Sequence, residues 1–425
     1  MTLPGAAAES LWWAGLQPPE VSADPMPPRT DVAVIGGGYT GLAAARALAR
    51  RGAQVLVLER EIVGWGASSR NGGMVLPGYK ADLADLVRRL GLARARALFE
   101  DSLAAIGFVE SLVRQEAIAC DWRRTGHLTL AARPSHLHGL EDTARLLARD
   151  FGYQTELLAP EALAEEIGST RYHGGLLDPL AGSLQPARYL VGLAAAAVKA
   201  GAVLRERVEV RRIQRASPGV RLHASHGPLD AREVLIATNG YTGRLLPWLA
   251  RRVVPVGSYI IATERLGAEV QQRLIPRGRM LSDTKNLLYY FRLSPDGRLV
   301  FGGRAAFVPT ALERSQEILR QGMIEVFPEL ATARIEYAWG GTLGFTLDQL
   351  PHAGRRDGMT YALGYGGHGV ALASWLGDRV GQAMAGAAPW PALTAIPFRP
   401  IPFYWGRPWF LPLAGAYYGL KDRLL

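Results

Sequence analysis

Residues 31–60, DVAVIGGGYTGLAAARALARRGAQVLVLER, constrain the fold of this chain more than any other segment. An apolar run leads into the glycine pattern of Gly36, Gly38 and Gly41, an alanine-rich segment follows, and a second apolar run ends at Glu59. In a strand–helix–strand unit these glycines permit a tight turn, bring backbone against a pyrophosphate and let the helix pack closely on the strand. The phosphates sit at the helix N-terminus, where N–H groups favour anions. The segment predicts a Rossmann-type dinucleotide site.

The acid that ends the second apolar run narrows the choice of dinucleotide. Glu59 follows Gly41 by eighteen residues, the separation expected of a carboxylate that binds ribose hydroxyls. A carboxylate here disfavours a 2′-phosphate, so we expect FAD or NAD rather than NADP, although Arg60 is adjacent.

Two further glycine-rich segments favour FAD over NAD. Residues 64–73, GWGASSRNGG, place small side chains where backbone can lie against a flat ring. Residues 364–370, GYGGHGV, begin a second helix whose N-terminus could stabilise the negative charge of a reduced flavin. Close helix packing would explain this second glycine group equally well. An NAD-dependent dehydrogenase would leave both segments without a role.

Composition limits the remaining classes. With 48% hydrophobic and 20% charged residues, the chain is typical of globular proteins. The net charge of +10 comes without a dense basic run, so specific nucleic-acid binding is not expected. Cys120 is the only cysteine and the eight histidines lack metal-ligand spacing, so no metal site is predicted. No signal peptide or transmembrane segment is recognised, and we expect a cytoplasmic location.

The order of predicted elements indicates an α/β fold with a second, α+β domain. Strand–helix patterns occur at both ends and in the middle of the chain, whereas strands dominate residues 252–336. The predicted division is an N-terminal arm (1–30), a discontinuous dinucleotide-binding domain (31–118, 183–246 and 337–386), a substrate domain (119–182 and 247–336) and a C-terminal tail (387–425). The tail ends in an amphipathic helix, and its Trp and Pro content fits contact with either a membrane surface or a partner.

Motifs along nearly the whole chain carry a family resemblance. They are SLWW, VIGGGYTGL, VGWGASSRNGG, LQPARYLVGLA, IATNGYT, GYGGHGVALA and LKDRL. With these motifs the chain resembles the FAD-dependent amine and amino-acid oxidoreductases of the D-amino-acid oxidase and sarcosine oxidase superfamily, in particular the bacterial γ-glutamylputrescine oxidoreductase-like branch. The resemblance implies a Rossmann-type FAD domain whose flavin is covered on the substrate side by an antiparallel sheet.

The resemblance also implies the FAD-binding residues. They are Gly36, Gly38, Tyr39, Thr40, Gly41, Glu59 and Arg60 for the ADP half; Gly66, Ala67, Ser68, Arg70, Asn71, Gly72 and Gly73 for the isoalloxazine and its chain; Val208, Thr238 and Asn239 near strand ends; and Gly364, Gly367, His368, Gly369 and Val370 at the pyrimidine edge. Some relatives attach FAD through a cysteine or a histidine. Here Gly341 occupies the cysteine position and residues 66–73 contain no histidine, so we expect non-covalent FAD.

The implied reaction is hydride transfer from the carbon beside an amine nitrogen to flavin N5, giving an imine that hydrolyses. His368 could help take the amine proton or could only hold its turn. Tyr289 and Tyr290 alternate across a strand, so only one is expected to face the flavin, and Tyr290 is the catalytic candidate. The substrate candidates are Arg70, Tyr289, Arg292, Trp339 and Phe345, of which the last two are either pocket walls or core.

Two positions depart from the sarcosine oxidase pattern. Ala371 stands where those enzymes carry a lysine for the substrate carboxylate, although Arg70, Arg292 or Arg304 could replace it. Val300 stands where they carry a lysine that speeds electron transfer to oxygen.

Lys285 is the only lysine that we expect to reach the flavin, as a catalytic candidate, and a solvated loop position is the alternative. We expect the substrate to be an amine with an acylated or extended chain. The electron acceptor is either oxygen or another compound, and we expect the reduced flavin to react slowly with oxygen. The alternatives are an N-alkyl- or D-amino-acid oxidase of the same fold and a flavoprotein acting on modified tRNA.

Overall fold

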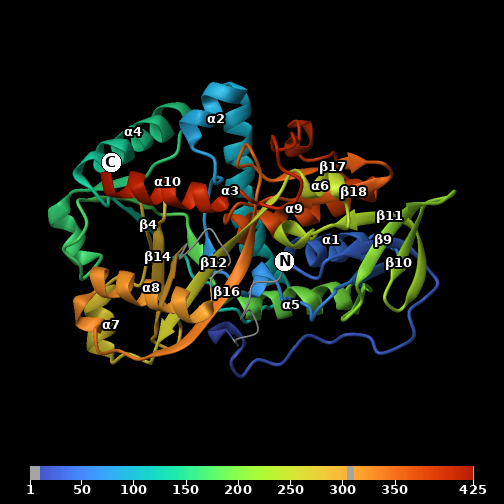
Figure 1. Cartoon of the computed structure of the whole chain (residues 1–425), viewed down its shortest axis with the longest axis horizontal. Helices are drawn as coiled ribbons and strands as arrows, with labels where there is room; N and C mark the ends of the chain where they lie inside the picture. Colours follow the sequence, from blue (N-terminus) through green and yellow to red (C-terminus); the bar gives the residue numbers. More distant parts are fainter. Residues whose placement is uncertain (1–9, 304–310, 425) are drawn as a thin grey trace.

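The computed structural model describes residues 10–303 and 311–424. In these residues two eight-stranded sheets form the two ends of the molecule, and most helices lie against one sheet or the other (Figure 1). The predicted fold class, an α/β Rossmann-type unit with a second domain, is confirmed. Arg304, named above as a possible contact of the substrate carboxylate, lies outside the described residues.

The first sheet contains the predicted strand–helix–strand unit. Its path runs β17 (His352–Arg356), β18 (Met359–Leu363), β11 (Gly227–Ile236), β1 (Arg29–Ile35), β2 (Val55–Leu58) and β8 (Val203–Arg205), and the hairpin β9 (Val210–Arg215) and β10 (Val220–Ala224) pairs with β11. Strands β18 to β8 along this path are mutually parallel, and β17 is antiparallel to β18.

Both faces of this sheet are covered, which explains its nearly continuous apolar strands. In β1, Val32 and Val34 pack into a core shared with the surrounding helices. The alternate residues Ala33 and Ile35 pack into a separate core built largely from the β9–β10 hairpin and residues 245–253. The parallel strands therefore have a fixed register, and their carboxyl ends meet along one edge.

The second sheet is mainly antiparallel. Its order is β16 (Ile335–Phe345), β12 (Val254–Thr263), β15 (Leu299–Gly303), β14 (Tyr289–Leu293), β13 (Met280–Asp283), β4 (His127–Leu130), β6 (Gly175–Asp178) and β5 (Glu156–Leu158). Only β13 and β4 pair in parallel among the strands of this path. A two-stranded sheet joins β3 (Met74–Val75) to β7 (Gly182–Ser183).

One strand departs from the predicted domain division. Strand β16 pairs with β12 from Ile335 to Phe345, so residues 337–345 belong to the second sheet and not to the dinucleotide-binding domain. The sequence did not indicate this because the strand pattern of residues 335–345 does not show which of the two sheets the strand joins.

The helices complete the two ends of the molecule. They are α1 (Tyr39–Ala49), α2 (Leu83–Leu90), α3 (Leu92–Gln115), α4 (Pro134–Phe151), α5 (Pro186–Lys199), α6 (Pro247–Ala250), α7 (Ala268–Leu274), α8 (Leu312–Val326), α9 (Gly369–Met384) and α10 (Leu411–Leu424). The short 3₁₀ helices are η1 (Leu11–Trp13), η2 (Ala67–Ser69), η3 (Pro160–Glu165), η4 (Asn239–Tyr241), η5 (Pro328–Leu330) and η6 (Ala392–Ala395). No helix in the described ranges is both long enough and apolar enough to span a bilayer.

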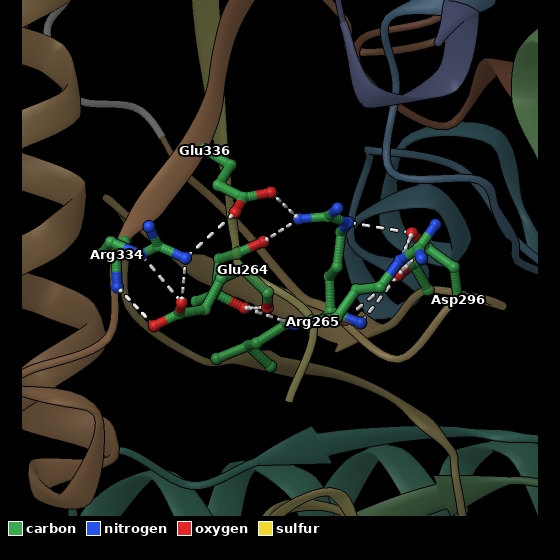
Figure 2. Close-up of polar contacts among 9 residues, drawn as sticks. Glu264, Arg265, Asp296, Arg334 and Glu336 are labelled. Atoms are coloured by element: carbon green, nitrogen blue, oxygen red, sulfur yellow. Dashed lines mark hydrogen bonds and ion pairs between the residues drawn. The ribbon is translucent and has the colours of Figure 1, made fainter. Parts of the chain in front are cut away.

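An ion-pair network joins three strand ends of the second sheet (Figure 2). Arg298, before β15, pairs with Asp296 at 2.8 Å and with Glu336 of β16 at 2.5 Å, and donates to the Thr263 carbonyl of β12. Arg334 pairs with Glu264 at 2.7 Å. Most of these side chains are partly exposed, so each pair contributes little alone, and the network mainly fixes where the strands end.

Candidate active site

A cavity of about 680 Å³ lies between the two sheets. On one side it begins where four parallel strands end, because Gly36 follows β1, Glu59 follows β2, Thr238 follows β11 and the 364–370 turn follows β18. Ligands of open α/β sheets bind in the crevice outside the carboxyl ends of the strands. The predicted dinucleotide site therefore coincides with a cavity of ligand size.

Most predicted site residues line this cavity. They are Gly36, Gly38, Tyr39, Thr40, Glu59, Arg60, Gly66, Ala67, Ser68, Arg70, Asn71, Gly72, Val208, Thr238, Asn239, Tyr290, Gly367, His368, Gly369 and Val370. Eight predicted residues are absent from the wall: Gly41, Gly73, Lys285, Tyr289, Arg292, Trp339, Phe345 and Gly364.

The glycine turn leaves no space for side chains. Gly36 has a φ of +112°, and a Cβ atom there would lie 2.7 Å from the Ala237 carbonyl oxygen. A Cβ atom on Gly41 would collide with the carbonyl oxygen of Gly36, so this glycine serves helix packing from behind the cavity wall. Next to the turn, the Tyr39 backbone N–H donates to Ser68 Oγ at 3.0 Å. Backbone can therefore approach a bound phosphate closely at this turn.

Glu59 presents a pre-positioned carboxylate to the cavity. Its Oε2 accepts from the Gly37 N–H at 2.8 Å, and its Oε1 accepts from the Glu61 N–H at 2.9 Å. Burial raises the pKa of this carboxyl, while those two N–H groups and the nearby charge of Arg60 oppose the shift. The remaining lone pairs on both oxygens can accept hydroxyl groups.

The loop of residues 66–73 is held by three indoles, of which those of Trp12 and Trp339 are buried and that of Trp13 is partly buried. Trp12 Nε1 donates to the Asn71 carbonyl at 2.8 Å, Trp13 Nε1 donates to Ser69 Oγ at 2.8 Å, and Trp339 Nε1 donates to the Arg70 carbonyl at 3.0 Å. Trp12 is 1% exposed and makes an edge contact with the Trp339 ring. The segment around Trp12, predicted as part of an extended arm, is thus buried beneath this loop. Trp339 supports the loop instead of forming the wall.

Two helix N-termini face the cavity. Gly38 is the N-cap of α1 and His368 is the N-cap of α9. A Cβ atom on Gly377 of α9 would collide with the Thr40 carbonyl of α1, so glycine lets these two helices pack closely. Behind the 364–370 turn, the Gly364 N–H donates to Asn239 Oδ1 at 2.9 Å. The N-terminus of α9 at the cavity agrees with a positive helix pole there, and the close packing of the two helices occurs further along α9, at Gly377.

The second sheet supplies the opposite wall, here called the second-sheet half of the cavity. It is formed by His127, Thr129, Ser258, Ser282, Tyr290, Gly341 and Leu343 of the second sheet, by Leu288 next to β14, and by Met74, Leu76 and Lys80 from β3 and the segment after it. His127 and Ser282 are hydrogen-bonded at 3.0 Å across the parallel β4–β13 pair. Burial lowers the pKa of His127 to about 4, so its ring is neutral near pH 7. Sequence reasoning missed His127 and Ser282, because only the strand pairing brings them to the cavity.

The lysine prediction was wrong in its choice of residue. Lys285 Nζ lies 3.2 Å from Asp283 Oδ2 and 3.4 Å from the centre of the Tyr289 ring, away from the cavity. Lys80 lines the cavity instead, and its Cβ lies 3.1 Å from where a Cβ atom on Gly366 would stand. Val300 is 2% exposed in the core. Lys80 was overlooked because it precedes a helix far along the chain, and only the fold brings it beside the 364–370 turn.

The two tyrosines separate as their alternation predicts. Tyr290 lines the cavity and approaches Ser258 Oγ at 3.3 Å, whereas Tyr289 packs against Phe301 with ring centres 5.0 Å apart. Tyr289 and Phe345, both predicted to touch substrate, instead pack in the protein interior.

Of the two described arginines predicted to contact substrate, only Arg70 reaches the cavity. Its Nε donates to the Trp65 carbonyl at 2.7 Å, and burial lowers its pKa. Arg292 lies behind the loop, where its Nη2 donates to the Leu184 carbonyl at 2.8 Å, and burial lowers its pKa to about 10. A Cβ atom on Gly73 would meet this guanidinium at 2.9 Å, which places both residues behind the wall.

Cys120 is not among the residues that line this cavity. Cys120 is buried, and burial raises its thiol pKa to about 12, as expected of a packing residue. The described residues contain no cluster of three or more His, Cys, Asp or Glu side chains arranged to hold a metal ion.

Comparison with known proteins identifies the family. The FAD dependent oxidoreductase (DAO) family matches residues 31–383. The chain belongs to this family. Gamma-glutamylputrescine oxidoreductase of Escherichia coli K12 is 34% identical over 93% of this chain and 93% of its own length. "Probable oxidoreductase OrdL" of Haemophilus influenzae is 36% identical, covering 84% of this chain and 83% of its own length. Among solved structures, glycine oxidase from Geobacillus kaustophilus has the same fold, with a TM-score of 0.72 at 23% identity over 88% of this chain and 99% of that one.

This FAD-dependent oxidoreductase has a cavity that fits its cofactor. The glycine turn at residues 36–38 admits a pyrophosphate, the Glu59 carboxylate suits a ribose, and the supported loop of residues 66–73 offers a flat backbone surface. The predictions of the family and of FAD are confirmed. The contacts of individual residues with FAD stay predictions.

Proposed function

We propose that this protein oxidises the C–N bond of an amine that carries an acidic acyl chain. When bound, FAD accepts a hydride from the carbon beside the amine nitrogen. The chain itself must bind the amine uncharged, orient that carbon and exclude water. The described second-sheet half of the cavity supports this role because it contains the cation of Lys80, adjoins that of Arg70, and includes no carboxylate.

This charge distribution favours the reactive form of an amine. Because the described second-sheet half includes no carboxylate, no ion pair there raises the pKa of a bound amine. His127 adds no positive charge near pH 7, because burial lowers its pKa to about 4. The hydroxyls of Thr129, Ser258 and Ser282 can orient the uncharged nitrogen without stabilising its protonated form.

The same cations suit a carboxylate at the far end of the substrate. Lys80 and Arg70 can pair with it, while Met74, Leu76 and Leu288 provide an apolar wall for the connecting methylenes. Ala371 is 2% exposed inside α9, so the carboxylate site of sarcosine oxidases is not reproduced there. The E. coli relative named for γ-glutamylputrescine supports a substrate of this class.

The test is a panel of amines mixed anaerobically with the purified holoprotein. We expect γ-glutamylputrescine to reduce the flavin fastest, N-acetylputrescine more slowly, and putrescine, sarcosine and D-alanine slowest. Lys80→Met should raise the KM for γ-glutamylputrescine and leave that for N-acetylputrescine nearly unchanged. Fastest reduction by sarcosine or D-alanine would support the alternative N-alkyl- or D-amino-acid oxidase and contradict this proposal.

Two broader features complete the proposal. The chain divides into the FAD-binding and substrate domains predicted above, with residues 337–345 reassigned to the second sheet. The protein acts in the cytoplasm, which fits its single buried cysteine.

A further inference from the structure

The C-terminal tail exposes six large apolar side chains. This tail face consists of Phe403, Trp405, Trp409, Leu413, Tyr417 and Leu420, with exposed fractions from 57% to 74%. Its last three members follow a spacing of four and three residues on α10, so they share one side of that helix. The other large apolar side chains exposed in the described residues are scattered aliphatic ones, such as Leu157 and Ile318.

The opposite side of α10 is firmly attached, so the exposure is a property of the folded protein. Leu411 is 7% exposed and packs with Val254, Val256 and Tyr404. At the other end of the helix, the Asp422 carboxylate accepts from the Leu287 N–H at 2.8 Å and from its neighbour Asn286. Folding therefore fixes α10 with Leu413, Tyr417 and Leu420 exposed to solvent.

The surroundings of the tail face are positively charged. Among the described side chains of residues 387–422, the basic ones are Arg399, Arg407 and Lys421, and the one acid is Asp422. The carboxylate of that acid is occupied by inward hydrogen bonds. From the body of the protein, the Arg251 guanidinium lies 6.0 Å from the centre of the Trp405 ring.

We propose that the tail face binds the surface of an anionic lipid bilayer. Tryptophan and tyrosine partition to the boundary between headgroups and acyl chains, and a helix with an apolar face and basic neighbours lies in that boundary. Arginine and lysine beside it are attracted to anionic headgroups. A second copy of the chain is a poorer occupant, because pairing two such tails brings like charges together. Since no helix among the described residues can span a bilayer, the attachment is peripheral.

The attachment would place the bilayer beside the active site. Leu287 and Phe345 belong to the apolar cluster that contains Leu411 of α10. Each is close in the chain to a residue of the cavity wall, since Leu287 directly precedes Leu288 and Phe345 closely follows Leu343. Wall residues of the second-sheet half are therefore close chain neighbours of residues that pack against α10, so a bilayer bound to the tail would lie near the active site.

The experiment is sedimentation of the full-length holoprotein with vesicles of equal parts phosphatidylglycerol and phosphatidylcholine. We expect binding to these vesicles, at least about tenfold weaker binding to pure phosphatidylcholine, and loss of binding at high salt. Leu413→Glu should reduce binding about tenfold or more, because it places a charge at the apolar boundary. Trp405→Ser provides a second variant, and flavin absorbance and Tm verify that each variant is folded.

The matched control is Ile318→Glu, which puts the same charge on an exposed aliphatic position of α8, a helix separate from α10 (Figure 1). It should bind vesicles like the wild type. Absence of wild-type binding, or equal loss in Leu413→Glu and Ile318→Glu, would overturn the proposal. A concentration-dependent dimer that Leu413→Glu dissociates, without vesicle binding, would identify a second copy as the occupant and overturn it too.

Discussion

Replacing Glu59 by glutamine changes one oxygen and one charge at the cofactor end of the cavity. The carboxylate is held by two backbone N–H donors, from Gly37 and Glu61, so its position does not depend on FAD. In Glu59→Gln one of these donors faces an amide NH₂ group, and a bound ribose loses a charged acceptor. We therefore expect weaker FAD binding with the fold retained.

The expected magnitude follows from the bond that is lost. A hydrogen bond to a charged group contributes about 1.5–3 kcal/mol, which corresponds to a Kd for FAD raised by about 10- to 150-fold. The Kd can be measured by titrating apoprotein with FAD and following flavin fluorescence.

The pH dependence adds a second signature. Burial raises the pKa of Glu59, and a ribose hydroxyl binds best to the ionised form. Wild-type affinity should therefore fall as pH decreases through that raised pKa, whereas Glu59→Gln should show no such decline.

The control is Glu61→Gln, the same substitution two residues away, on a side chain that is 38% exposed and pairs with Arg60. It should leave the Kd for FAD within about twofold of wild type, in keeping with the small effect of surface pairs. Equal loss of affinity in both variants, or no loss in Glu59→Gln, would refute the assignment of Glu59 to the ribose.

Three further predictions follow from the cavity wall. Lys80→Met removes a fixed positive charge from the cavity and should slow reoxidation of the reduced flavin by oxygen about tenfold or more in stopped-flow measurements. Lys285→Met should leave the reoxidation rate unchanged, and equal effects of the two substitutions would contradict a role of Lys80 in the oxygen reaction. In the folded protein the pKa of His127 is lowered to about 4, so the unfolded chain takes up the proton first and the folded state loses stability as pH falls from about 6.5 to 4. His127→Gln removes this group and should flatten the decline of Tm over that pH range. Trp339→Phe should lower the free energy of unfolding by about 1–3 kcal/mol, since it leaves the part-buried Arg70 carbonyl without its donor, and an unchanged free energy of unfolding would show that the loop of residues 66–73 does not need that support.

The cofactor half of the site could be predicted because its signals are local. Gly36, Gly38 and Glu59 lie within one strand–helix–strand unit, where spacing along the chain fixes positions in space. The 364–370 turn follows a strand parallel to that unit, so the same rule places it at the same edge.

The second-sheet half could not be predicted because long-range pairing creates it. His127 reaches the cavity only because β4 pairs with β13, more than a hundred residues later. Lys80 lies beside the 364–370 turn because segments distant in the chain pack together there. For Tyr289 and Tyr290, alternation along the strand predicts that only one faces the cavity, but it does not show which of the two does. The indole support of Trp12 and Trp339 had no sequence signal, since tryptophan hydrogen bonds follow from tertiary contacts alone.

The central claim is that the cavity holds non-covalent FAD, which takes two electrons from an amine. The most direct test is anaerobic mixing of the purified yellow protein with γ-glutamylputrescine, followed by assays of flavin bleaching, carbonyl product and acid-released FAD. The account predicts complete bleaching, one carbonyl product for each flavin reduced, and release of intact FAD into the acid supernatant. A colourless protein, flavin that remains with the precipitate, or a flavin that no amine bleaches would contradict it.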